Sequence, residues 1–500
     1  MTPIWTASLP IRSSTGYQTS QNGSAAKNEP NNLLDLEENV DPRIVSFRSA
    51  LDKRGLTGFQ IRMIAVALGL AVMDGFDVQI IGYVAPILSG LWHIDPKSFG
   101  LIFGAGLLGL ALGPIAFSPL ADKIGCRPVL IGCTILYALG TLATTTVHSW
   151  SMLLGLRFLT GLGLGGVLPC TIAVVSDYAP TRARNLMLAI SSSGFAIGGS
   201  LGGFVAAATI ERFGWQTVFW IGGIVPLLIL PVLLIWFPES LSRLLSDPSQ
   251  HSRLEKVVAR LAPGWTAPEG QPSRDERNDG FPVAVLFSKG LAVPTLLIWS
   301  IFLCSLLLLY FFVNWIPTVV HALGQPLQAS NNAAAVFQLA GLLGGFFFNH
   351  LADRTGRPEW ALASSFAGAT ICCFFFGSAA GASLPIIVAS VAVTGFCVVG
   401  ALGVCISFVG TYYPSSIRAT GIGWGIGIGR LGSIAGPILG GVLLTLNLSS
   451  EALFAVFAIP AMVAVICSAC LRRSAEQGGP KDDYPHGPRI GARAINDARA

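Results

Sequence analysis

Two carboxylates, Asp74 and Asp77, lie near the middle of a long apolar run at 61–91. Three residues apart on a helix, the two side chains share a face. By helical rise, Asp74 lies roughly 20 Å from the start of the run, too deep for either acid to reach the lipid headgroups by changing rotamer. An acid inside a membrane costs ~2.5 to 3.5 kcal/mol and usually faces a cavity or a partner. The pair therefore indicates a functional site: proton coupling is the favoured interpretation, and structural hydrogen bonding is the alternative.

Two arginines inside other apolar segments are the cations that could complement these acids. Arg430 lies roughly 16 Å from the nearer end of its segment, a depth comparable to that of Asp74. A guanidinium can hold a carboxylate through two parallel hydrogen bonds, so Arg430 is predicted to bind a substrate carboxylate; a buried ion pair between helices is the alternative. Arg157 has a depth similar to that of Asp77. A pair between them would either break when Asp77 takes a proton or be permanently structural.

The composition requires a membrane protein. Of 500 residues, 52% are hydrophobic and only 11% are charged, whereas about a quarter are charged in soluble domains. Twelve apolar segments are long enough to span a bilayer. They lie at 62–84, 99–119, 128–147, 152–175, 187–208, 216–237, 291–316, 331–350, 360–379, 384–409, 419–442 and 451–471. The sequence predicts an all-α membrane protein with twelve transmembrane helices.

The positive charges predict the orientation. Of the 31 Lys and Arg residues, only Lys97 and Arg212 fall in one set of loops and Arg157 and Arg430 lie deep within spans; the rest, with Arg62 counted in the N-terminal tail, lie in the other loops and the two tails. The positive-inside rule therefore places both termini in the cytoplasm. The basic balance describes a membrane surface, and no nucleic-acid partner is expected. The ten cysteines and six histidines show no metal-type spacing, and we expect neither disulfides nor a metal site.

Polarity divides the chain into five parts. Residues 1–60 are expected to form a mostly disordered cytoplasmic tail, with a short amphipathic piece near 43–54. A six-helix bundle at 61–237 and a second one at 291–471 are joined by a cytoplasmic loop at 238–290. A short cytoplasmic tail follows at 472–500.

The two bundles repeat each other. SPLADKIGCR at 118–127 is echoed by NHLADRTGRP at 349–358, and PTRAR at 180–184 by PSSIR at 414–418. Such repeats predict two pseudo-symmetric six-helix bundles; further matches pair Gly198 and Gly202 with Gly432 and Gly436. Charged residues at or near the repeated loops are predicted to form a gate that locks the cytoplasmic side by ion pairs, and solvated loop charge is the alternative. The predicted gate residues are Asp122, Asp177, Arg184, Asp353, Arg354 and Arg418.

These motifs carry a family resemblance. LADK and LADR, each followed by Gly, resemble the loop signature of the major facilitator superfamily; RFLTGLGLGG at 157–166 and FPES at 237–240 resemble its fourth and sixth helices. Within that superfamily, DGFDVQIIGYVAPIL at 74–88 is similar to the first helix of the aromatic acid:proton symporters. The resemblance, over roughly 57–471, implies alternating access and uptake of benzoate-like and hydroxybenzoate-like anions through a bacterial cytoplasmic (inner) membrane.

Recognition of an aromatic ring needs stacking walls near the anion site. The candidates at helix centres are Phe76, Tyr310, Phe311, Trp315 and Trp424, with Asn314 and Gln338 for a ring hydroxyl, and a lipid-facing position is the alternative for each. The glycine strings at 161–166 and 423–429 do not open a βαβ unit, so they indicate close helix packing rather than nucleotide binding.

Energetics favours a proton-coupled importer. An anion entering a cell that is negative inside works against about 2.3 kcal/mol per 100 mV, and one co-transported proton cancels that charge. The expected partners are a small aromatic carboxylate, protons and the bilayer; the protein is expected to be a monomer without cofactor or enzymatic activity. The alternatives are a superfamily transporter of another organic anion or a sugar acid, an efflux pump, and a membrane sensor without flux.

Overall fold

The computed structural model describes residues 42–52, 55–265, 282–287, 290–377, 382–413, 415–446 and 448–478. The expectation of disorder at 1–41 and most of the predicted C-terminal tail lie outside these residues. Within the described ranges the secondary structure is helical, joined by short turns.

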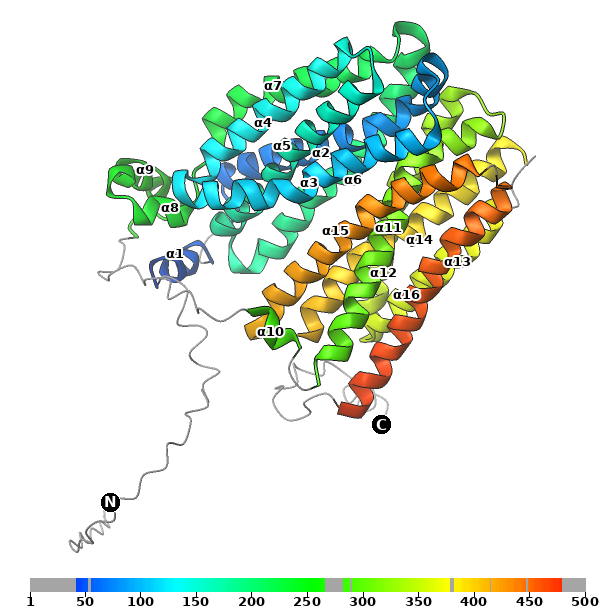
Figure 1. Cartoon of the computed structure of the whole chain (residues 1–500). Helices are drawn as coiled ribbons and strands as arrows, with labels where there is room; N and C mark the ends of the chain where they lie inside the picture. Colours follow the sequence, from blue (N-terminus) through cyan, green and yellow to red (C-terminus); the bar gives the residue numbers. More distant parts are fainter. Residues whose placement is uncertain are drawn as a thin grey trace, which may run out of the picture. The chain divides into compact units, whose positions relative to one another are not determined.

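Twelve of the described helices are long and apolar enough to cross a membrane, which confirms the predicted fold class. Helices are suited to the apolar interior of a membrane because each forms its own backbone hydrogen bonds. The first bundle consists of α2 (Gly58–Trp92), α3 (Pro96–Ile124), α4 (Cys126–Ala143), α5 (Trp150–Tyr178), α6 (Arg184–Phe213) and α7 (Gln216–Trp236). The second consists of α11 (Ala292–Ala322), α12 (Leu327–Thr355), α13 (Pro358–Gly377), α14 (Leu384–Tyr412), α15 (Ser415–Thr445) and α16 (Ser450–Gly478). Figure 1 shows the two groups of helices.

Short helices lie at one end of the spans. They are α1 (Pro42–Asp52), α8 (Leu241–Ser246), α9 (His251–Leu261) and α10 (Pro282–Leu286), with the 3-10 turns η2 (Thr181–Ala183) and η3 (Pro248–Gln250) at the same end; a third 3-10 turn, η1 (Thr144–Thr146), follows α4. The ends of the spanning helices near α1, α8, α9 and α10 are called the α1 end here, and the opposite ends the far end (Figure 1).

Helix α1 corresponds to the short piece expected near 43–54, and it packs against the inter-bundle connection. Phe47 is fully buried, with its ring 5.2 Å from that of Trp265. The Trp265 indole donates to Ser46 Oγ at 2.8 Å, and Asp52 Oδ1 accepts from the Thr181 backbone N–H at 2.7 Å. The end of the predicted tail is therefore part of the first bundle's α1 end.

The helix ends follow local sequence signals. Thr57 and Gln60 form a reciprocal capping box at the start of α2, and Asp95 caps α3 through Ser98 N–H at 3.4 Å. Gly125 and Gly356, which the sequence repeat pairs, end α3 and α12 with φ of +105° and +62°. Glycine tolerates such backbone angles without strain, so the repeated Gly is a helix stop at the same place in each bundle.

Glycines also set the helix contacts that the repeat predicts. A Cβ at Gly198 of α6 would overlap the Val72 carbonyl of α2, and a Cβ at Gly432 of α15 would overlap the Leu303 carbonyl of α11. The same helix pair is thus in backbone contact in each bundle, because only a hydrogen in place of a side chain allows this approach.

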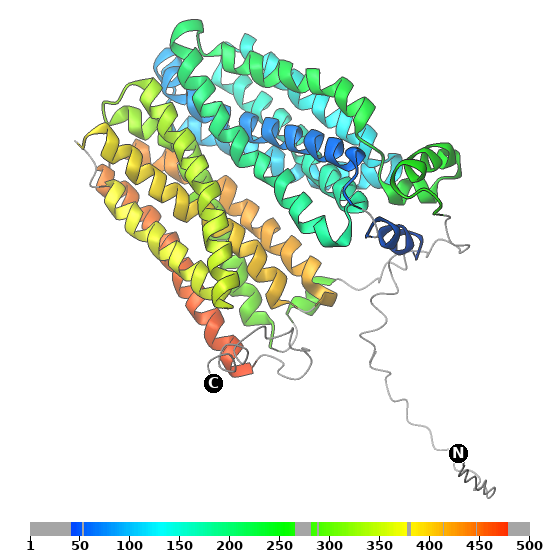
Figure 2. The same ribbon diagram turned by 180° about the vertical axis from the view of Figure 1, so that it is seen from behind.

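The two bundles touch through the far-end halves of their helices. Ser200 Oγ of α6 donates to the Ala335 carbonyl of α12 at 3.1 Å, and the Phe103 ring of α3 lies 5.3 Å from Trp315 of α11, edge to face. A Cβ at Gly100 of α3 would come within 2.9 Å of the Pro437 carbonyl of α15. Figure 2 shows the same two groups of helices from behind.

Candidate functional site

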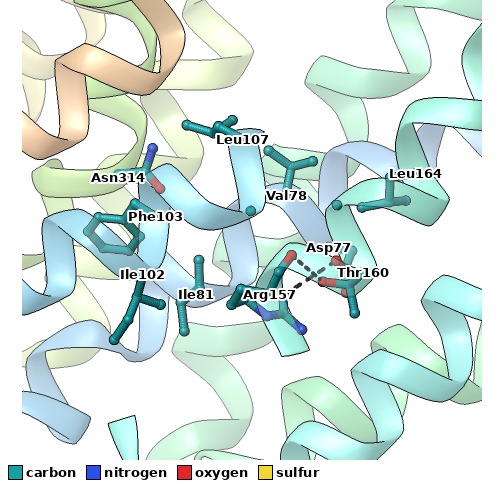
Figure 3. Close-up of a pocket in the computed structure, with 12 residues that line it drawn as sticks. Asp77, Val78, Ile81, Ile102, Phe103, Leu107, Arg157, Thr160, Leu164 and Asn314 are labelled. Carbon is teal, nitrogen blue, oxygen red and sulfur yellow. Dashed lines mark hydrogen bonds and ion pairs between the residues drawn. The ribbon is translucent and has the colours of Figure 1, made fainter. Parts of the chain in front are cut away.

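A buried ion pair joins α2 to α5. Asp77 Oδ2 lies 3.4 Å from Arg157 Nη1, and the two side chains are 1% and 4% exposed. Thr141 Oγ1 of α4 donates to the other Asp77 oxygen at 2.5 Å, and Arg157 Nη2 donates to Thr144 Oγ1 at 3.2 Å. The structure therefore brings together the two residues that the depth estimate placed at one level (Figure 3).

The first bundle holds this pair in a fixed geometry. The Phe219 ring of α7 lies 5.3 Å from the Arg157 guanidinium carbon, a cation–π distance. Gly161 of α5 packs against the Gly106 carbonyl of α3, so α3 and α5 are in backbone contact beside the pair. Removing one member of such a pair leaves an uncompensated buried charge and typically costs about 3–5 kcal/mol.

A pocket lies beside the ion pair, where the two bundles meet. Its walls come from α2, α3 and α5 of the first bundle, with Asn314 from α11 of the second. They are mostly apolar, with Asp77 and Arg157 on one side and Asn314 on the other (Figure 3). The lining residues are Asp77, Val78, Ile81, Ile102, Phe103, Gly106, Leu107, Arg157, Thr160, Gly161, Leu164 and Asn314. An apolar cavity with a few polar groups is typical of small-molecule sites.

A second ionic centre lies one helical turn away on α2. Asp74 is 4% exposed, and its Oδ1 has no hydrogen-bond partner among the described residues. The positive charge of Arg430 acts on both Asp74 and the Tyr310 hydroxyl, so α2, α11 and α15 contribute to one cluster. Within the described ranges no carboxylate lies within 4.0 Å of the half-buried Arg430 guanidinium. Among the described residues, Arg430 therefore has no carboxylate in direct contact, whereas Arg157 does.

One face of α15 shows where the bundles separate. At its far end, Ile438 lies against Gly104 of α3 and Gly441 against the Pro96 carbonyl. At Gly427 and Gly423, on the same face beyond Arg430, no described atom lies within 4 Å of the position that a Cβ would take. The interface is thus closed on the far-end side of Arg430 and open toward the α1 end.

This finding corrects part of the glycine prediction. Gly161 packs closely, as expected, and so do Gly425 and Gly429, both against Phe302. Gly423 and Gly427 do not, although the same packing role was predicted for the whole string. Sequence cannot distinguish the two uses, because a small residue is equally suited to a helix contact and to the wall of a space.

Two of the residues proposed for ring recognition, Tyr310 and Asn314, lie in or near the site. Tyr310 faces Arg430, and Asn314 lines the pocket while its amide donates to the Tyr310 carbonyl at 2.7 Å. Gln338 of α12 is 2% exposed, and its Oε1 has no partner in the described part of the chain.

The other proposed aromatic walls lie outside the pocket lining in this structure, and their role in ring recognition stays a prediction. Phe76 lies inside the first bundle, its ring against Gly202 and Gly222, and Phe311 stacks on Phe457 inside the second. Trp315 donates to the Pro437 carbonyl at 3.0 Å and packs behind Phe103, outside the pocket lining. Trp424 is 41% exposed and stacks on Trp299 at the surface. The side of the helix on which each residue lies decides what it packs against. When nearly every position of a helix is apolar, the sequence does not show which side faces the site.

Sequence reasoning missed the polar partners on α4 and on the η1 turn that follows it. Thr141 and Thr144 bind Asp77 and Arg157, and Tyr137 is 1% exposed with its hydroxyl unpartnered among the described residues. No sequence signal singles them out, because threonine and tyrosine are ordinary residues in a membrane helix.

The FPES segment at 237–240 follows α7 and is hydrogen-bonded to the start of α4 and the end of α5 at the α1 end. The Glu239 carboxylate accepts from the backbone N–H groups of Cys126 and Ser240 at 2.7 and 2.9 Å, which caps the start of α4. Asp177 Oδ2 accepts from the Leu241 N–H at 2.9 Å.

The remaining predicted gate residues lie exposed at the α1 end, where the interface is open. Arg184 donates to Ser176 Oγ within its own bundle. Their predicted role concerns the state in which this end is closed, so it remains a prediction. The exposed residues are Asp122, Arg184, Asp353, Arg354 and Arg418.

Two six-helix membrane bundles with charged side chains buried around their junction define the class of secondary transporters. The family model of the Major Facilitator Superfamily matches residues 67–331 and 298–494, and the chain belongs to that superfamily. It is a transporter rather than an enzyme. In the described part of the chain, no group of three or more His, Cys, Asp or Glu residues is arranged to hold a metal ion.

Similar proteins agree with this assignment. The chain is 32% identical over 426 residues to the gallate transporter of Pseudomonas putida, covering 84% of this chain and 94% of that one. It is 31% identical over 436 residues to a 4-hydroxybenzoate transporter of the same organism, covering 87% and 97%. The fold is similar to that of a D-xylose-proton symporter, with a TM-score of 0.63 at 15% identity and coverage of 83% and 97%.

Proposed function

We propose that this protein imports small aromatic carboxylates of the benzoate or hydroxybenzoate type together with protons, by alternating access. The observation that carries the proposal is Arg430: a cation between the two bundles, without a direct carboxylate partner in the described structure, beside the buried acid Asp74 and the open face of α15. The relatives named for gallate and 4-hydroxybenzoate support this substrate class.

In this proposal Arg430 binds the substrate carboxylate through its guanidinium fork. The Tyr310 hydroxyl lies next to the Arg430 guanidinium. Because Gly427 and Gly423 have no side chains, there is space for the substrate between Arg430 and the α1 end. Asn314 lies at the adjoining apolar pocket and would bind a ring hydroxyl. The unpaired Gln338 amide oxygen would serve the same purpose.

Asp74 and Asp77 would carry the coupled protons. When Asp77 is ionised, Arg157 and Thr141 satisfy it; a proton on Asp77 would remove the attraction between α2 and α5. Binding of an anion next to Asp74 favours a proton there, so substrate and proton raise each other's affinity. The coupling thereby neutralises the charge that the membrane potential opposes.

The α1 end would face the cytoplasm and would carry the gate. The distribution of Lys and Arg supports cytoplasmic termini in a bacterial inner membrane, so the α1 end would be cytoplasmic. Asp122, Asp177, Arg184, Asp353, Arg354 and Arg418 would pair across that end when it closes. The site lies within a single chain, which is consistent with a monomer.

Uptake into proteoliposomes tests the function. We expect labelled 4-hydroxybenzoate or benzoate to accumulate when the outside is acidic, and a protonophore to abolish accumulation while leaving counterflow exchange intact. Accumulation at the full rate after collapse of the proton gradient would refute proton coupling. Exchange of no aromatic carboxylate in a panel of benzoate, 4-hydroxybenzoate, protocatechuate and gallate would refute the substrate class.

A further inference from the structure

Helix register brings a tyrosine of α4 to the level of Asp74. Helices α2 and α4 both start at the α1 end, so they run in the same direction. The hydrogen bond from Thr141 to Asp77 fixes their relative height. One turn toward the α1 end, three or four residues back on each helix, the pair at the next level is Tyr137 and Asp74.

Both polar groups at this level lack a partner in the described structure. Tyr137 is 1% exposed and Asp74 is 4% exposed, and neither the tyrosine hydroxyl nor Asp74 Oδ1 has a hydrogen bond. The charges of both Asp74 and Asp77 act on the Tyr137 hydroxyl. Leaving two buried polar groups unpaired is costly, and a hydrogen bond between them would satisfy both.

We propose that Tyr137 is a positioning residue for proton coupling: its hydroxyl donates a hydrogen bond to ionised Asp74 and so opposes loading of the proton before the substrate arrives. This inference rests on the proposed function. A hydroxyl is a donor to a carboxylate but gains less from a protonated acid, so it favours the ionised form. An anion bound at Arg430 shifts the balance the other way, and proton loading then follows substrate binding.

Other groups around Asp74 bear on its protonation. Arg430 of α15 and Tyr310 of α11 act on it from the second bundle, and Asp77, itself paired with Arg157 of α5, acts from the same helix. The described contacts from α6 and α7 to residues 72–76 of α2 come from residues that do not titrate: Gly194, Phe195, Gly198, Gly202 and Gly222. Replacing Tyr137 by phenylalanine therefore removes a hydrogen-bond donor at the level of Asp74 and leaves the charges around Asp74 unchanged.

The test compares Tyr137→Phe with Tyr83→Phe, both assayed for proton-driven uptake of 4-hydroxybenzoate across a pH series. Tyr83 is a matched control because it is fully buried and its hydroxyl donates to the Gly199 carbonyl at 2.6 Å rather than to an acid. We expect the pH midpoint of uptake to move to more alkaline pH by about one unit in Tyr137→Phe, since a hydrogen bond to a charged group contributes about 1.5–3 kcal/mol. Tyr83→Phe should keep the wild-type midpoint. We also expect Tyr137→Phe to show a faster proton leak without substrate.

The outcomes separate the possible failures. A lower rate with an unchanged midpoint would assign Tyr137 to packing and overturn the inference, as would an acid shift. Tyr137→Leu repeats the test with a different side chain, and loss of both variants during purification would also assign the residue to folding. If the wild type transported no aromatic carboxylate, the proposed function would fail first, so the two failures are distinguishable.

Discussion

Replacement of Arg430 by glutamine tests the proposed anion site most directly. The guanidinium is half-buried and has no direct carboxylate partner in the described structure. Its loss should therefore disturb the resting protein little and the bound state greatly. Arg157→Gln is expected to behave differently, because Arg157 neutralises Asp77 in the absence of substrate.

The magnitude follows from the geometry. Truncating one member of a hydrogen-bonded charge pair costs about 2–5 kcal/mol, and the partial exposure of Arg430 places the expected loss in the lower part, about 2–3 kcal/mol. This corresponds to an increase of roughly 30- to 150-fold in Kd. Arg430→Lys keeps the charge but loses the planar fork, so an intermediate loss is expected.

The assay is calorimetric binding to purified protein, with 4-hydroxybenzoate compared with 4-hydroxybenzamide. The variant should weaken binding of the acid and leave the weaker binding of the amide nearly unchanged, because the amide lacks the charge that Arg430 binds. Arg212→Gln, an exposed arginine at the far end of α6, is the matched control. An equal loss for acid and amide would show that Arg430 does not contact the carboxylate.

Three further predictions concern the ion pair, the open face and the gate. Asp77→Asn should lower the thermal stability of the purified protein, because Arg157 would stay buried without its partner, at a cost of about 3–5 kcal/mol; adding Arg157→Gln should restore stability but not proton-driven accumulation, and full accumulation would contradict the coupling role. Gly427→Leu should abolish counterflow of 4-hydroxybenzoate at unchanged melting temperature by filling the space beside Arg430, whereas Gly132→Leu, at another open position, should not; equal activity would show that the ring binds elsewhere. Arg418→Gln should slow counterflow several-fold with Kd unchanged, and an unchanged rate would favour simple solvated charge.

In the proposed mechanism, the two ionic centres have different roles in proton coupling. Asp77 is satisfied in the described conformation by Arg157 and Thr141, whereas Asp74 has an unpaired oxygen and faces an arginine without a direct carboxylate partner. Such asymmetry suits a transporter, because a site whose charged groups were all paired without substrate would gain no new interactions when the substrate binds. In this proposal, the balance between the two conformations of the transporter depends on which of the two acids is protonated and on whether a substrate carboxylate is bound to Arg430.

The sequence correctly predicted the elements because their signals are local. Twelve spans follow from apolar length, and the repeat marks Gly125 and Gly356 as matching helix ends. It also predicted that Arg157 and Asp77 share a level, since depth in a spanning helix is a count of residues.

Helix rotation and neighbours could not be predicted in this way. Phe76, Trp315 and Trp424 were expected to line the site, yet each lies on a face that packs elsewhere or meets the surroundings. In a helix that is apolar nearly all round, periodicity does not show which side faces the partner. The polar partners on α4 and η1 were missed because threonine and tyrosine are ordinary residues in a membrane helix.

The sequence alone determined that the chain crosses a membrane with twelve helices in two related halves and keeps two acids and two arginines inside. Hydrophobic length and the cost of buried charge act along the chain, so both can be read from it. Only the tertiary structure decided that Arg157 has a carboxylate partner and that Arg430 has none among the described residues, and on which side of Arg430 the bundles separate. Those outcomes depend on contacts between helices distant in sequence, where a single glycine sets how closely two backbones approach.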